Sequence, residues 1–151
     1  SSDLFEDIAK DYPSVRHDTV IIDAACMKLV TDPSFFDVIV TTNLFGDILS
    51  DLTSGLVGGL GLTCGNNIGN DCGIFEAVHG SAPDIAGQNK ANPTAVITAA
   101  SEMLRYTGFT NEAEHIEAAV RKTFKEGKHL TADLGGTATT TEFTDALINN
   151  L

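Results

Sequence analysis

The sequence has few basic residues: nine Lys and Arg stand against 21 Asp and Glu, which gives a formal net charge of −12 at pH 7. Nucleic acids and anionic membrane surfaces attract proteins through dense Lys and Arg. We therefore expect neither a nucleic acid nor a membrane among the partners of this protein. An acidic chain can still bind anions locally, through backbone N–H groups at helix starts.

Cysteine is also scarce. Cys26, Cys64 and Cys72 are odd in number and lack CxxC spacing, which argues against a disulfide framework and against a zinc site. We expect reduced, intracellular thiols. No apolar run approaches the roughly 18 to 20 residues of a membrane span, and no signal-peptide pattern is present.

What the sequence does contain is typical of a globular domain. Its 151 residues are 42% hydrophobic and 20% charged, with only 4 Pro, and this length suits one domain with a core. The chain has no initiator Met, and Ser1-Ser2-Asp3 leads at once into a helical apolar pattern from Leu4. We expect a fragment of a longer protein.

The first part of the chain alternates predicted helices and strands. From apolar spacing and from Pro13 and Pro33, we predict helices over residues 4–11, 24–30 and 45–57 and strands over residues 19–23 and 36–41. Strand and helix alternating over residues 19–57 is the pattern of an α/β layer.

Glycine is frequent over residues 55–69, which match neither a Walker loop nor a strand-linked GxGxxG. We interpret this stretch as a crossing between two parts of the molecule. A predicted strand over residues 73–78 follows, and then predicted helices over about 93–108, 111–127 and 142–151. The predicted fold class is α/β with mixed sheet elements and a helical C-terminal half.

Asp47 and Asp51 lie four residues apart in a predicted helix, so their carboxylates stack on one face. Stacked carboxylates repel each other, and a divalent cation relieves that repulsion. Mg²⁺ is commonly held by one or two carboxylates plus substrate oxygens. The alternative is a solvated helix start, where the helix dipole favours Asp. The residues alone leave both interpretations open.

Residues 79–93, HGSAPDIAGQNKANP, form a predicted loop between a strand and a helix. A loop of this length without secondary structure is usually functional, so we expect a ligand site. Asp84 suits a ribose, because its carboxylate accepts two hydrogen bonds from a diol and repels a 2′-phosphate, which favours NAD over NADP. A simple Pro-Asp turn is the alternative interpretation.

Three motifs together resemble a known family: NLFGDILSD at residues 43–51, HGSAPDIAGQNKANP at 79–93 and LGGTATTTEFTDAL at 134–147. They resemble the β-decarboxylating dehydrogenases of the isocitrate/isopropylmalate dehydrogenase family, and most closely the NAD-dependent isocitrate dehydrogenases. The resemblance covers nearly the whole chain and implies that family's fold. Residues 1–60 would be part of the small dimer-forming lobe with metal-binding aspartates. Residues 61–151 would be the C-terminal part of the large cofactor-binding lobe.

The resemblance also implies residue roles. Asp47 and Asp51 match the family's metal-ligating aspartates, and Asp23 matches a third acid that reaches into the neighbouring subunit's active site. The implied cofactor residues are Glu76 toward the nicotinamide, His79 and Asn92 at the adenine, Asp84 at the adenosine ribose, and Gly80, Ser81, Ala82 and Ile85 beside them. No catalytic residue is expected within this segment, because the family's acid/base and substrate-carboxylate residues lie upstream. The fragment alone is expected to be inactive.

The implied reaction is oxidative decarboxylation of isocitrate to 2-oxoglutarate and CO₂. NAD takes the hydride, and Mg²⁺ or Mn²⁺ acts as a Lewis acid. The alternatives are 3-isopropylmalate or homoisocitrate dehydrogenase, and a regulatory, non-catalytic isocitrate dehydrogenase subunit. The implied partners are other subunits of a homo- or hetero-oligomer that share the active site across a dimer interface. The implied location is the mitochondrial matrix if the source is eukaryotic, and the cytoplasm otherwise.

Overall fold

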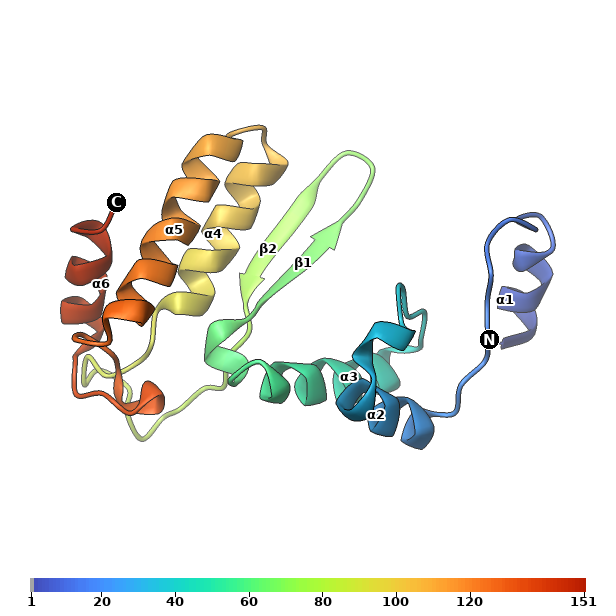
Figure 1. The fold of residues 1–151 in the computed structure, drawn as a ribbon, viewed down its shortest axis with the longest axis horizontal. Coiled ribbons are helices and arrows are strands. Elements are labelled where there is room, and N and C mark those ends of the chain that lie inside the picture. The colour runs from blue at the N-terminus through green and yellow to red at the C-terminus, as the bar shows by residue number, and fades with distance from the viewer. Residues whose placement is uncertain (1) are drawn as a thin grey trace. The chain divides into compact units, whose positions relative to one another are not determined.

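The computed structural model describes residues 2–151, so Ser1, with which the first predicted lobe begins, lies outside the described residues. The chain divides into two compact units, the first ending at Leu56 and the second running from Val57 to Leu151 (Figure 1). This division falls close to the predicted boundary between residues 60 and 61, while the roles of the two lobes stay predictions. Among the described residues, no helix is both long and apolar enough to cross a membrane.

The first unit is helical. Its elements are α1 (Ser2–Ala9), α2 (Ile22–Thr31), the 3₁₀ turn η1 (Pro33–Phe35) and α3 (Asn43–Leu56). Ala25 and Leu29 of α2 and Leu49 of α3 form the buried centre of its core. The three helices predicted here are confirmed, with their ends shifted by one or two residues.

Both strands predicted in the first unit are wrong. Residues 19–23 are not part of a sheet, since α2 begins before that predicted strand ends, and residues 36–41 form no strand. A strand needs a hydrogen-bonded neighbour, and the only sheet among the described residues is a two-stranded one in the second unit. Val38 and Val40 accordingly remain 82% and 71% exposed.

The second unit is a hairpin packed against helices. Its elements are η2 (Leu60–Leu62), β1 (Cys64–Ile68), β2 (Gly73–Ala77), α4 (Thr94–Tyr106), α5 (Thr110–Glu126), η3 (Ala132–Leu134) and α6 (Thr140–Ile148). β1 and β2 are antiparallel, with Cys64 opposite Ala77 and Ile68 opposite Gly73. α4 packs on both strands, α5 packs on α4, and α6 packs on α5 (Figure 1).

The strand predicted at β2 and the three helices predicted in this unit are confirmed, and so is the α/β fold class. β1 was not predicted, because its Gly65, Asn66 and Asn67 are residues typical of turns.

α6 begins two residues before its predicted start because Thr139 caps it. Thr139 Oγ1 accepts a hydrogen bond from Glu142 N at 3.2 Å, and the Glu142 carboxylate accepts one from Thr139 N at 2.8 Å. This T-x-x-E arrangement is a capping box, a signal present in the sequence. The hydrogen bonds from the Thr139 backbone and hydroxyl lower the pKa of Glu142 below its ordinary value.

Candidate functional site

The first candidate site is the pair of carboxylates on α3. Asp47 and Asp51 lie one helical turn apart, and both are exposed. Asn43 Nδ2 donates to Asp47 Oδ2 at 3.0 Å. Within residues 2–151, neither Asp47 Oδ1 nor the Asp51 carboxylate has a hydrogen-bond donor. Two such carboxylates fit a hard divalent cation whose remaining ligands come from substrate and water.

Asp23 does not join this pair. It lies exposed in the first turn of α2, where its Oδ1 accepts a hydrogen bond from Ala24 N at 2.7 Å. Nowhere in the described part of the chain do three or more His, Cys, Asp or Glu side chains gather to hold a metal. Residues 2–151 therefore supply two carboxylates at α3 and no third ligand of these types.

The second candidate site begins at the end of β2. Glu76 is exposed opposite Gly65, and its Oε1 accepts a hydrogen bond from Asn67 Nδ2 at 3.4 Å. His79 follows the strand and is exposed, with its Nδ1 2.8 Å from Gly80 O. The strand end thus presents a carboxylate and an imidazole to solvent.

Successive turns shape the middle of the loop. Ile85 N donates to Ala82 O and Gln88 N donates to Ile85 O, both at 3.1 Å. Ala82 has a φ of 38°, in the left-handed region that disfavours residues with a side chain. Among the described residues no donor contacts the Asp84 carboxylate, so both of its oxygens are available to a diol. Ile85 is half-buried, whereas the other predicted cofactor residues of this stretch are exposed: Gly80, Ser81, Ala82 and Asp84.

The end of the loop is tied to the threonine-rich tail. Asn92 Nδ2 donates to Asp133 Oδ2 at 2.9 Å, and Asn92 Oδ1 accepts from Thr94 N at 3.0 Å and from Thr94 Oγ1 at 2.6 Å. Thr140 N donates to Asn89 O at 2.8 Å. Sequence reasoning missed the contacts to Asp133 and Thr140, because no local pattern shows which distant residue a loop meets.

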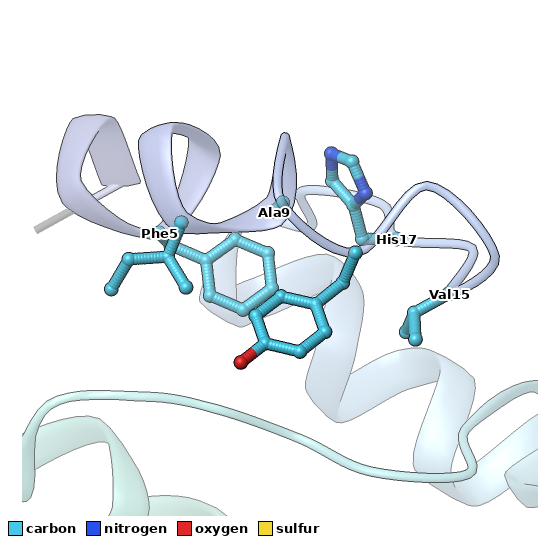
Figure 2. A pocket seen from close by; sticks show the side chains of 6 residues that line it. Phe5, Ala9, Val15 and His17 are labelled. Carbon is cyan, nitrogen blue, oxygen red and sulfur yellow. The ribbon is translucent and has the colours of Figure 1, made fainter.

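A separate hollow of about 200 Å³ lies against α1 (Figure 2). Its lining is mostly apolar and consists of Phe5, Ile8, Ala9, Tyr12, Val15 and His17. His17 Nε2 lies 3.2 Å from Glu6 Oε2, so this imidazole already has a polar partner. The hollow contains neither paired acids nor a nucleophile with a base, and we assign no chemistry to it.

The sequence matches a known family. Residues 2–147 match the family model described as isocitrate/isopropylmalate dehydrogenase. The chain is 55% identical over 146 residues to isocitrate dehydrogenase [NAD] catalytic subunit 5, mitochondrial, of Arabidopsis thaliana, and 56% identical over 149 residues to 3-isopropylmalate dehydrogenase of Archaeoglobus fulgidus. These alignments cover 96% and 99% of this chain but only 39% and 45% of those relatives.

A crystal structure of isocitrate dehydrogenase from Methylococcus capsulatus superposes with a TM-score of 0.87 at 50% identity, over 98% of this chain and 44% of that chain. Fold and sequence together define part of a dehydrogenase. The chain belongs to the isocitrate/isopropylmalate dehydrogenase family. It spans about two fifths of the length of the relatives it matches.

The relatives differ in substrate and in role. A regulatory subunit of mitochondrial NAD isocitrate dehydrogenase from Dictyostelium discoideum is 53% identical, over 96% of this chain and 41% of that relative. Family membership therefore leaves several substrates and a non-catalytic role open.

Proposed function

We propose that the full-length protein is an NAD-dependent isocitrate dehydrogenase that converts isocitrate to 2-oxoglutarate and CO₂. The observation that carries this proposal is the pair of exposed carboxylates, Asp47 and Asp51, stacked on α3. The pair stands in a chain whose second unit carries the loop 79–93, with Asp84 at an exposed turn.

Asp47 and Asp51 would hold Mg²⁺ or Mn²⁺. When bound, such a cation supplies Lewis-acid polarisation of substrate oxygens. The chain's own contribution is two negative charges placed one turn apart by the helix, whose mutual repulsion a cation offsets. Asp23 would serve the active site of a neighbouring subunit, which makes an oligomer with shared sites part of the proposal.

Loop 79–93 would bind NAD. Asp84 would accept hydrogen bonds from the adenosine ribose and repel a 2′-phosphate. His79 and Asn92 would lie at the adenine, Glu76 toward the nicotinamide, and Gly80, Ser81, Ala82 and Ile85 beside them. The general acid and base would come from the part of the protein upstream of this chain, so residues 1–151 alone would be inactive. The mitochondrial matrix is the proposed location if the source is eukaryotic.

Calorimetric titration of the full-length protein with isocitrate, with and without Mg²⁺, tests this proposal. We expect Mg²⁺-dependent binding that Asp47→Asn and Asp51→Asn each abolish. Asp37→Asn removes the same charge from another exposed position of the first unit and should leave binding intact. Isocitrate binding that survives both α3 substitutions would overturn the metal site and would favour a regulatory subunit.

The second candidate is a 3-isopropylmalate or homoisocitrate dehydrogenase. The 56% identity to the Archaeoglobus fulgidus enzyme favours it. The same titration with 3-isopropylmalate and homoisocitrate separates these substrates, because the enzyme should bind its own substrate at least tenfold more tightly, a difference of about 1.4 kcal/mol.

A further inference from the structure

Three residues more than 40 positions further along the sequence form hydrogen bonds with the end of loop 79–93: Asp133, Thr140 and Thr141. We call these contacts the brace. Thr140 Oγ1 donates to Ala91 O at 2.5 Å, and Thr141 Oγ1 donates to Asn89 Oδ1 at 3.1 Å. Asn89 itself has a φ of 57°, in the left-handed region, which such contacts help to hold. These contacts define the shape of the end of the loop.

Asp133 stands at the centre of this brace. Its Oδ1 accepts a hydrogen bond from Thr131 Oγ1 at 2.6 Å, and its Oδ2 accepts one from Asn92 Nδ2 at 2.9 Å. Thr131 is fully buried, and its carbonyl accepts hydrogen bonds from Leu134 N and Gly136 N, both at 3.0 Å. Asp133 thus links the buried Thr131 to Asn92, near the end of the loop.

The Asn92 amide has only one workable orientation. Its Oδ1 must face Thr94, because the Thr94 backbone N–H can only donate, and so its Nδ2 must face Asp133. Asn92 therefore connects the loop to α4 through Thr94, and Asp133 accepts a hydrogen bond from the other end of the same amide.

We propose that Asp133 is a positioning residue for NAD: through Asn92 it fixes the end of loop 79–93 in the shape that receives the dinucleotide. This inference rests on the proposed function, since it takes the loop to be the NAD site. Asp133 acts on NAD affinity through Asn92, not by touching the cofactor. It pre-organises the loop, so binding does not have to order these residues.

Calorimetric titration of the full-length protein with NAD, in wild type, Asp133→Ala, Asn92→Ala and the double variant, tests the inference. We expect Asp133→Ala to weaken NAD binding roughly tenfold, since it removes a hydrogen bond to a charged group. Asn92→Ala should weaken it at least as much, because the proposed function also places Asn92 at the adenine. The double variant should bind NAD no more than about twofold more weakly than the weaker-binding single variant, because both substitutions break the same hydrogen bond between Asp133 and Asn92. Mg²⁺–isocitrate binding should not change.

Two further variants complete the set. Asp145→Ala removes an equal charge from an exposed position on α6 and should leave NAD affinity unchanged. Asp133→Asn keeps the shape: its oxygen can accept from Asn92 and its amide N–H can donate to the Thr131 hydroxyl, but it loses the charge that strengthens both hydrogen bonds. Its loss of affinity should therefore fall between wild type and Asp133→Ala.

Hydrogen exchange of the protein without ligands gives a readout that does not depend on binding. The amides of Gln88, Thr94 and Thr140, which are hydrogen-bonded in or beside the loop, should exchange about tenfold faster in Asp133→Ala. Amides in the middle of α4 and α5 should exchange as in wild type.

The outcomes are distinct. Losses that multiply to about a hundredfold in the double variant would show that Asp133 acts independently of Asn92 and would overturn the positioning role. So would unchanged NAD affinity in Asp133→Ala, or faster exchange spread evenly over all helices of the second unit. A wild-type protein that binds Mg²⁺–isocitrate but not NAD would overturn the proposed cofactor, and with it this inference.

Discussion

In the threonine-rich tail, the backbone at Gly136 packs too closely against residue Leu130 for a side chain to fit. Ala138 N donates to Leu130 O at 2.9 Å, and Gly136 N donates to Thr131 O at 3.0 Å, so two stretches of backbone run in contact. A Cβ added at Gly136 would overlap the Leu130 carbonyl group. A flexible side chain could move aside, but this backbone is held by its own hydrogen bonds. Glycine at residue 136 is therefore required by space.

Gly136→Ala should destabilise the second unit by about 1 to 3 kcal/mol, the usual cost of overpacking. Gly80→Ala is the matched control, because nothing lies within 4 Å of the Cβ that it adds, and its effect should stay within about 0.5 kcal/mol. Urea denaturation of the full-length protein measures both. If the two variants unfold at the same urea concentration, the steric requirement for glycine at residue 136 is contradicted.

Between secondary-structure elements, a polar cluster joins α4 to α5. Ser101 of α4 is fully buried, and its Oγ donates to Ala113 O of α5 at 3.1 Å. Arg105 of α4 forms a hydrogen-bonded ion pair with Glu117 of α5, and Arg121 lies 3.5 Å from the same carboxylate. The hydrogen bond from Arg105, together with its charge, lowers the pKa of Glu117 below the ordinary value of 4.5, although burial opposes the shift.

This shift predicts how stability depends on pH. A folded-state pKa below the unfolded one means that Glu117 contributes stability above pH 4.5, and that the contribution is lost as pH falls through the lower folded pKa. We expect Glu117→Gln to flatten the decrease of Tm on acidification. Glu126→Gln, which removes an exposed carboxylate from the same helix, should keep the wild-type slope. Thermal melts from about pH 6 to pH 3 measure this, and identical slopes for wild type and Glu117→Gln would refute it.

At the scale of the whole molecule, the main feature is that the first unit leaves many large apolar side chains exposed. They lie on and after α1 and in the segment before α3, and include Leu4, Ile8, Tyr12, Val15, Ile21, Val38 and Val40. Four exposed apolar residues, Phe5, Ile8, Tyr12 and Val15, line one hollow, and apolar surface gathered in this way is typical of a surface that another chain or segment covers.

The isolated 151-residue chain should accordingly self-associate or be poorly soluble. Replacing Val38 and Val40 by Lys should reduce the association, because these two side chains are 82% and 71% exposed. Replacing the exposed polar residues Asn70 and Asn111 by Lys adds the same charge without removing apolar surface, and should reduce it less. Light scattering measures the mass of each variant. A monodisperse wild-type monomer would contradict this prediction.

The sequence by itself determined the positions of all six α-helices of the described residues to within about three residues, because helical periodicity, proline and glycine act within a few turns of the chain. It also determined that Asp47 and Asp51 share a helix face, since that follows from their spacing once the helix forms. The family could be recognised for the same reason: its motifs are continuous stretches that the sequence displays directly.

Only the tertiary structure decided which extended segments pair and what the loop touches. Val38 and Val40 have side chains suited to a strand but no neighbour to pair with among residues 2–151, whereas Gly65, Asn66 and Asn67 form β1 because β2 lies beside them. Asp133 meets Asn92 across 41 positions of sequence. Strand pairing and loop bracing depend on where remote backbone lies, and local propensity carries no information about that position.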